Sequence, residues 1–324
     1  MKKNILFIAI IATLFCLVAC SSKPAGWLTD FDEAKKIANR QDKNLLIFFS
    51  GEDWDGVSTD LKTNILTTPE FMTVVEEDYV LVQIDISNVA YESTEVPEDA
   101  TEEEKAAAQA ILADLEKKSE IASNFSVNTM PAILLTTKDG YIFSSLYNDP
   151  NTTREEYLEK IANAKETGNN IRELSKKVKS SRGVKKVTAI NNLYEALEPS
   201  YRYLLGDLIS QTLELDPENK SGVMDKFSIH DSNAKAMTKF MQGDFEAGIA
   251  ELKAPLETTF LSIEQKQEIY YQIAYLYATM LGPDYNETVM ENLETGYNLD
   301  TTTEIAATMK HTIDIYKTQV LQSE

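Results

Sequence analysis

The sequence predicts an α/β domain, with a mixed sheet flanked by helices, over residues 26–148, and an all-α helical-repeat domain over residues 152–324. Helical and strand-like apolar patterns alternate in the first region, whereas only helical patterns continue beyond Thr152. The chain has 324 residues, of which 43% are hydrophobic, so it can build two cores. The turn sequence Asp149-Pro150-Asn151 is the expected boundary.

Each expected element of the first region has a recognisable period. Apolar residues recur at helical spacing in residues 31–38, 55–66, 69–76 and 102–123. Strand character is found in residues 45–49, 79–86, 132–136 and 141–146. Leu45–Phe49 is apolar throughout, as expected of a central strand buried on both faces. Lys138-Asp139-Gly140 separates the last two strands and predicts a hairpin.

The helical region is expected to begin with a capping box formed by Thr152 and Glu155. Turn sequences then separate its helices, at residues 180–183, 216–219 and 282–284. The stretches 215–219, 242–249 and 296–300 resemble the turns of tetratricopeptide-type repeats, without a strict period. The resemblance implies two or three degenerate helix pairs that bury a core by stacking.

The N-terminus has the features of an export leader. Lys2 and Lys3 precede an apolar stretch, residues 5–19, that is too short to span a bilayer comfortably. Leu17-Val18-Ala19-Cys20 resembles a bacterial lipobox, which implies cleavage before Cys20, diacylation of its sulfur and a short tether over residues 20–25. An uncleaved anchor helix or an ordinary signal peptide are the alternatives. All three interpretations predict an exported protein. The lipobox further predicts that the protein is lipid-anchored at the cell envelope, in the outer membrane or at the periplasmic face.

Charge and composition exclude several classes of function. Asp and Glu outnumber Lys and Arg by 52 to 31, giving a net charge of −21 that repels nucleic-acid backbones. The two histidines, His230 and His311, are not at ligand spacing from each other or from a cysteine, so a His/Cys zinc site is not expected. We expect no metal and no cofactor.

Three stretches resemble the thioredoxin-like family. Residues 45–58, with the sequence LLIFFSGEDWDGVS, are similar to its central strand, its tryptophan and the start of its active-site helix. Residues 125–131, with the sequence FSVNTMP, are similar to its approach to a cis-proline, and the predicted hairpin follows. Pro69-Glu70-Phe71 resembles a helix of secreted bacterial members. The resemblance implies a thioredoxin-like fold for residues 26–148.

The two positions that carry thiol chemistry in that family are occupied here by Asp55 and Ser58. In the family, a thiolate at the helix start attacks a disulfide and a second thiol resolves the mixed disulfide. A carboxylate and a hydroxyl cannot perform these steps. The buried acid of the family would fall near Phe48 or Phe49. We therefore assign no catalytic residue.

Two interpretations of the acidic loop remain open at this point. In the first, Asp55 is the N-cap of the following helix, where its oxygens accept backbone N–H bonds. In the second, Glu52, Asp53 and Asp55, with or without Asp60, supply oxygen ligands to Ca²⁺ or Mg²⁺. The spacing does not match an EF-hand loop.

Peptide binding does not require the lost thiols. The resemblance implies that Trp54, Thr129, Met130 and Pro131 border a backbone edge on which an extended peptide adds as a strand. The alternative is that these residues only fill space around a scaffold turn.

Residues 91–104 carry seven acidic side chains. This run indicates either a solvated loop that leads into the first turn of a helix, or an acidic flap that faces a partner.

The sequence therefore predicts a redox-inactive, lipid-anchored protein that binds proteins or peptides at the cell envelope. The alternative is a thiol-disulfide oxidoreductase or isomerase homologue that acts through the cysteines of a partner. A structural spacer without a binding site is the third possibility.

Overall fold

The computed structural model describes residues 26–146 and 152–320. The chain divides into two compact units between Asn169 and Asn170, inside helix α7 (Arg154–Ser180). The leader, Cys20, the tether and the boundary expected at Asp149-Pro150-Asn151 lie outside the described residues.

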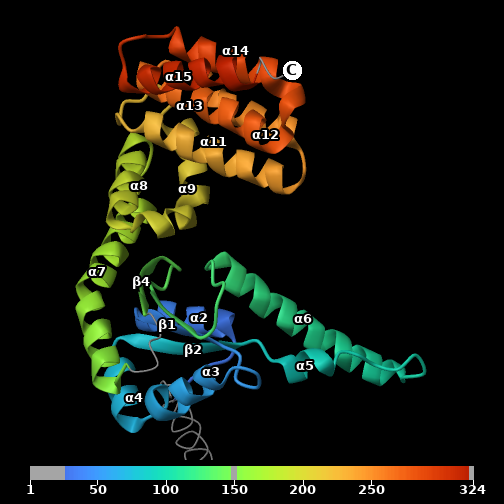
Figure 1. Ribbon diagram of the computed structural model, residues 1–324. Helices are drawn as coiled ribbons and strands as arrows, with labels where there is room; N and C mark the ends of the chain where they lie inside the picture. Colours follow the sequence, from blue (N-terminus) through green and yellow to red (C-terminus); the bar gives the residue numbers. More distant parts are fainter. Residues whose placement is uncertain (1–25, 147–151, 321–324) are drawn as a thin grey trace, which may run out of the picture. The chain divides into compact units, whose positions relative to one another are not determined.

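The first unit contains a mixed four-stranded sheet with the strand order β2-β1-β3-β4 (Figure 1). The strands are β1 (Asn44–Ser50), β2 (Tyr79–Asp85), β3 (Ala132–Thr136) and β4 (Ile142–Leu146). Strand β1 is parallel to β2 and antiparallel to β3, which forms the predicted hairpin with β4. Every residue of β1 is buried, which confirms that this apolar run is a central strand.

The predicted helices of this unit are present, with one internal change. They are α2 (Phe31–Gln41), α3 (Gly56–Leu61), α4 (Pro69–Val75) and α6 (Glu102–Asn124), and the short helix α5 (Asn88–Glu92), which no pattern predicted, precedes α6. After α3 the helix expected over residues 55–66 widens into a π-helical turn, Lys62–Leu66. The carbonyl of Lys62 accepts bonds from the backbone N–H and the hydroxyl of Thr67, which end the helix there.

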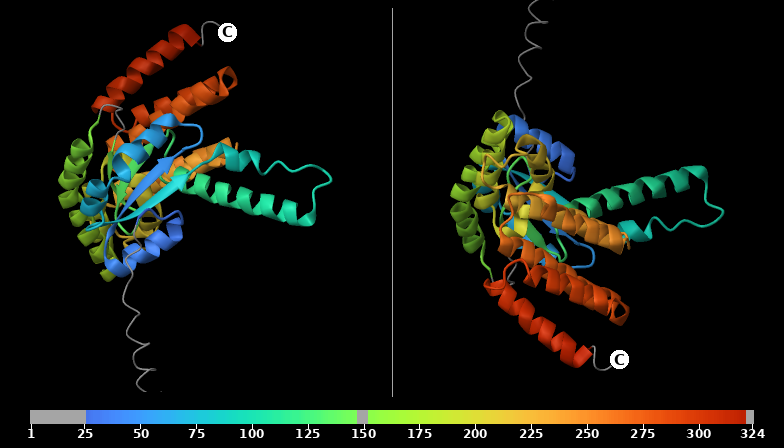
Figure 2. Two further views of the ribbon diagram at one scale, coloured as in Figure 1. Left: turned by 90° about the horizontal axis from the view of Figure 1, so that it is seen from below. Right: turned by 90° about the horizontal axis from the view of Figure 1, so that it is seen from above.

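Helix α6 is amphipathic only in part. Its start is fixed by a capping box between Thr101 and Glu104. The buried residues of the helix are Ala108, Leu115 and Ala122, whereas other apolar residues of its expected helical pattern are exposed: Ala106, Ala110 and Leu112. Figure 2 shows the reason, because α6 extends well beyond the edge of the sheet. Most of its first turns have no sheet beneath them.

Helix α7 begins one residue later than the sequence pattern suggested. The capping box predicted for Thr152 and Glu155 is wrong, because Thr153 and Glu156 form it through two reciprocal bonds between backbone N–H groups and side chains. The N-terminal half of α7 packs on the first unit, where Lys165 lies 2.6 Å from Asp78. Gly168 faces the ring of Phe143 on β4.

The second unit is helical throughout its described residues, as predicted. Its longer helices are α8 (Val184–Ala196), α11 (Met224–Met241), α12 (Phe245–Lys253), α13 (Ile263–Leu276), α14 (Asn286–Tyr297) and α15 (Glu304–Ile315). Shorter segments join them: Pro199–Leu205, Gly206–Ser210, Thr212–Leu215, Ala254–Glu257, Tyr277–Leu281, Pro283–Tyr285 and Tyr316–Val320. Consecutive helices pack in pairs, α11 with α12 and α13 with α14, around one apolar core.

In the two described ranges, no helix combines the length and the apolar character needed to cross a membrane.

We expect Gly168→Ala to destabilise the first unit. A Cβ at this position would lie 2.7 Å from the buried Phe143 ring. Overpacking of about 1–3 kcal/mol outweighs the gain of about 1 kcal/mol in helix propensity. Urea denaturation should show a lower midpoint. Gly206→Ala is the control, because that Cβ would meet no atom within 4 Å. A Gly168→Ala variant as stable as the wild type would contradict this packing.

Candidate functional site

The site lies where β1 ends and α3 begins. Asp55 has an extended backbone and caps α3, accepting N–H bonds from Val57 at 3.2 Å and from Ser58 at 3.1 Å. The fully buried Ser58 hydroxyl donates to Asp55 at 2.6 Å and accepts the N–H of Gly51 at 3.3 Å. The side chains of Asp55 and Ser58 are therefore bonded to each other, and Asp55 is an N-cap.

A carboxylate, and not a thiol, lies at the start of α3. In thiol enzymes of this type, the helix N-terminus stabilises a thiolate that appears during the reaction. Here a permanent carboxylate already occupies the backbone N–H groups of Val57 and Ser58. Phe48 and Phe49, near the position of the family's buried acid, are buried apolar side chains. The geometry is that of a structural cap.

Asp53 binds the start of a different helix, α5. Its carboxylate accepts bonds from the Val89 N–H at 2.6 Å, the Asn88 N–H at 3.2 Å and the Ser87 hydroxyl at 2.7 Å. The Val89 N–H has the largest effect on the pKa of Asp53 and lowers it. Desolvation opposes this effect, and the bonds from the Ser87 hydroxyl and the Asn88 N–H add to the lowering, so the pKa lies below its ordinary value. These bonds tie the loop after β1 to the start of α5.

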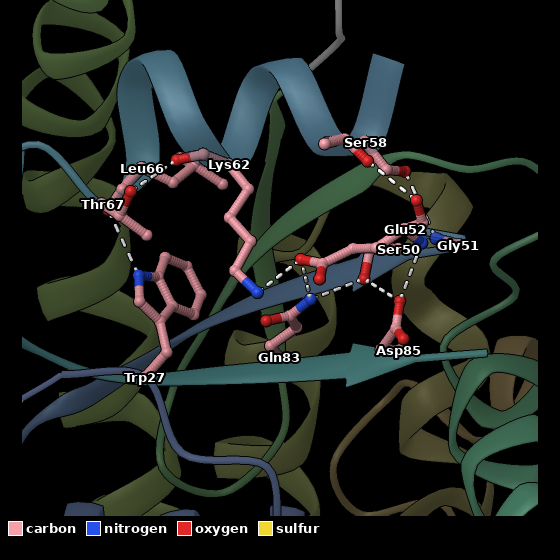
Figure 3. A network of polar contacts seen from close by, with 11 residues as sticks. Trp27, Ser50, Gly51, Glu52, Ser58, Lys62, Leu66, Thr67, Gln83 and Asp85 are labelled. Carbon is pink, nitrogen blue, oxygen red and sulfur yellow. Dashed lines mark hydrogen bonds and ion pairs between the residues drawn. The ribbon is translucent and has the colours of Figure 1, made fainter. Parts of the chain in front are cut away.

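Glu52 belongs to a third set of contacts, drawn in Figure 3. Its carboxylate lies 2.5 Å from the Lys62 ammonium and accepts a bond from the Gln83 amide at 2.7 Å. The same amide donates to the Ser50 hydroxyl at 2.8 Å, which in turn donates to Asp85 at 2.7 Å. The buried Ser50 and Gln83 are thus paired at the carboxyl ends of β1 and β2.

Three of the four acidic residues considered for an ion site have separate partners. Glu52 contacts Lys62, Asp53 caps α5, and Asp55 caps α3. In the residues that the structure describes, no group of three or more His, Cys, Asp or Glu side chains is placed to hold a metal ion.

Trp54, Thr129 and Met130 are brought together in one groove. Its volume is about 580 Å³, and its other lining residues are Ile86, Ser119, Ala122, Ser123, Val127 and Asn128. The indole N–H of Trp54 donates to the carbonyl of Ile86 at 2.7 Å. The ring lies directly over Gly51, where a Cβ would be 2.2 Å away. Pro131 follows the groove, and the Met130–Pro131 peptide bond is cis.

The backbone along this groove is open. In the described part of the chain, Asn128, Thr129 and Met130 make no hydrogen bond, because β3 pairs with β1 only from Ala132 onward. Such an edge offers N–H and C=O groups to an added strand. The groove has no charged lining residue, so apolar and neutral polar side chains suit it.

Sequence reasoning missed the second wall of this groove. Ile86 directly follows β2. Because β1 and β2 are parallel, their carboxyl ends meet at one edge of the sheet, and this rule could have placed Ile86 beside Trp54. Ser119, Ala122 and Ser123 lie on α6, and no local pattern indicated which face of α6 lines the groove.

Two family models match separate parts of the chain. Residues 26–111 match a model described as thioredoxin-like. The N-terminal domain is thioredoxin-like. Residues 223–322 match a model described as an uncharacterised protein C-terminal domain.

Individual relatives cover different shares of the chain. An uncharacterized protein of Treponema pallidum (strain Nichols) is 20% identical over 263 residues, which are 81% of this chain and 80% of that protein. The thioredoxin-related protein DsbJ of Chlamydia pneumoniae is 32% identical over 59 residues, 18% of this chain and 17% of that protein. Among solved structures, DsbH oxidoreductase is similar with a TM-score of 0.33 and 18% identity, over 44% of this chain and 90% of that one.

Asp55→Ala should destabilise the thioredoxin-like domain by about 2 kcal/mol, because it removes the N-cap and leaves the buried Ser58 hydroxyl without its acceptor. Asp55→Asn retains one acceptor oxygen and should lose about half as much. Urea denaturation measures both. Asp60→Ala, at an exposed position of the same helix, is the control and should change stability little. Equal effects of Asp55→Ala and Asp60→Ala would exclude the capping role.

The contribution of Asp53 should depend on pH. Because its pKa is lowered in the folded state, its stabilising effect is complete above the ordinary value of 3.8 and is lost as pH falls through the folded-state pKa. Asp53→Asn should therefore be less stable than the wild type at pH 7, with a difference that shrinks below about pH 4. Urea denaturation from pH 7 to pH 3 measures it. A difference that stays constant over this range would contradict the pKa direction.

Proposed function

We propose that the thioredoxin-like domain binds extended segments of other proteins without thiol chemistry. The observation that carries the proposal is the open edge at Asn128–Met130, next to the Trp54 ring in a groove of about 580 Å³. This size lies in the range of roughly 300–1,000 Å³ typical of ligand sites. The lining suits an uncharged segment whose backbone pairs with the edge and whose apolar side chains contact Trp54, Ile86 and Met130.

The contacts of Asp55 and Ser58 support the absence of redox activity. Both side chains have fixed structural partners, and the only cysteines of the sequence are Cys16 and Cys20, within the leader and lipobox. We propose that Cys20 is acylated and that its lipid attaches the protein to the cell envelope, which follows from the leader and lipobox pattern.

The alternative function is a thiol-disulfide oxidoreductase that uses the cysteines of a partner. The similarity of 59 residues to a thioredoxin-related Dsb protein supports it. The two functions differ in a measurable way, because only the alternative requires disulfide reduction.

Peptide binding by the full-length chain in non-ionic detergent tests the proposal. A peptide array selects an apolar binder, and calorimetry measures its affinity. Trp54→Ala should weaken binding at least tenfold, because the ring is one wall of the groove. Val74→Ala is the control, since Val74 is exposed on α4 and does not line the groove. Backbone N-methylation of the peptide should abolish binding if strand addition holds. Unchanged binding by Trp54→Ala would refute peptide binding in the groove.

Insulin reduction tests the chain itself for redox activity, apart from the cysteines of any partner. With Cys16 and Cys20 replaced by serine, the chain should reduce insulin no faster than the reductant alone. The same background carrying Asp55→Cys and Ser58→Cys is the matched control for the assay. Reduction by the serine-substituted chain without added thiols at positions 55 and 58 would overturn redox inactivity.

A further inference from the structure

The thioredoxin-like domain carries a projecting arm, residues 87–118, formed by α5, the connecting loop and the first turns of α6. Figure 2 shows the arm extending away from the sheet in both views. Apolar side chains are exposed along it, with Val89 64% and Tyr91 58% accessible. Exposed apolar side chains on a projecting element are typical of a surface that contacts a partner.

The outer part of the arm is strongly acidic. Between residues 92 and 104 there are seven Asp and Glu residues and no Lys or Arg. Glu102 pairs with Lys105, and Glu104 caps α6. The side chains of the other five make no ion pair or hydrogen bond in the described structure, and all are exposed: Glu92, Glu95, Glu98, Asp99 and Glu103. These five carboxylates are available to an external cation.

The arm and the groove are parts of one surface. Ile86 accepts the Trp54 indole N–H, and Asp53 caps α5, so the loop after β1 holds the base of the arm beside the groove. The other end of α6 supplies Ser119 and Ala122 to the groove wall. A segment bound in the groove can therefore continue along α6 toward the acidic tip.

We propose that the partner is a polypeptide segment with an apolar, uncharged core for the groove and a Lys- or Arg-rich flank for the arm. The inference rests on the proposed peptide binding and specifies its substrate class. Charge complementarity carries it, because the groove lining is uncharged whereas the adjoining arm is acidic.

The geometry fixes the spacing between core and flank. From Ser119 to Glu102, α6 spans about 26 Å at 1.5 Å per residue. An extended chain covers that length with about eight residues at roughly 3.3 Å each. The basic flank should therefore lie about eight residues from the apolar core.

Calorimetry with the full-length chain in non-ionic detergent tests this proposal. Peptides share one apolar core and carry four lysines, four glutamates or four serines eight residues away, on either side. The lysine peptide should bind about tenfold more tightly than the glutamate peptide at 20 mM salt, with a smaller difference at 500 mM salt because screening shortens the reach of the charges. A lysine flank two residues from the core should give a smaller preference.

Two variants with the same loss of five negative charges distinguish the arm from the overall acidity. The arm variant is Glu92→Gln/Glu95→Gln/Glu98→Gln/Asp99→Asn/Glu103→Gln. The control variant is Glu33→Gln/Asp60→Asn/Glu77→Gln/Glu159→Gln/Glu166→Gln, all at exposed positions of the same unit outside the arm. The arm variant should remove the lysine preference, and the control variant should keep most of it.

The outcomes are distinguishable. If the core peptide binds but the arm variant keeps the full lysine preference, the inference is wrong and the proposed function stands. If no peptide of any charge binds, the proposed function fails and the inference fails with it. Circular dichroism confirms that both variants fold before binding is compared.

Discussion

Backbone N–H groups at helix starts need acceptors, and the loop after β1 is organised by the two carboxylates that supply them. Asp55 accepts the first N–H groups of α3, and Asp53 accepts those of α5. Each acid is thereby committed to one helix. The same loop presses Trp54 onto Gly51 and places its indole against the carbonyl of Ile86. The groove wall depends on these caps.

The cap at the start of α3 sets the electrostatics of the site. The Asp55 carboxylate accepts the N–H groups of Val57 and Ser58 at the positive end of the helix. Below it, Ser50 and Gln83 bond to each other and to acidic neighbours, so burial of these polar groups is compensated. The site is therefore suited to holding a fixed surface next to the open edge at Asn128–Met130.

Local periodicity predicted the strands and helices well, because apolar spacing follows directly from the geometry of each element. Local pattern failed to choose between two capping boxes that the sequence allows equally. Thr152 with Glu155 and Thr153 with Glu156 have the same spacing, and the fold uses the second pair. It also failed for α6, whose period suggested a continuous buried face. The helix is exposed over its first turns because the sheet ends beneath it.

The sequence by itself determined an α/β first region and a helical second region, because apolar periodicity follows from the order of the residues. The resemblance of three stretches to the thioredoxin-like family implied the fold of the first region and the comparison of Asp55 and Ser58 with the family's thiol positions. The tertiary structure alone decided the partners of Asp53 and the bond between Glu52 and Gln83, which separate these acids from the capping Asp55 instead of gathering the three around an ion. It also decided that Ile86 and α6 complete the groove. The contacts of Glu52 with Gln83, of Asp53 with α5 and of Trp54 with Ile86 join segments more than 30 residues apart, which no local pattern encodes.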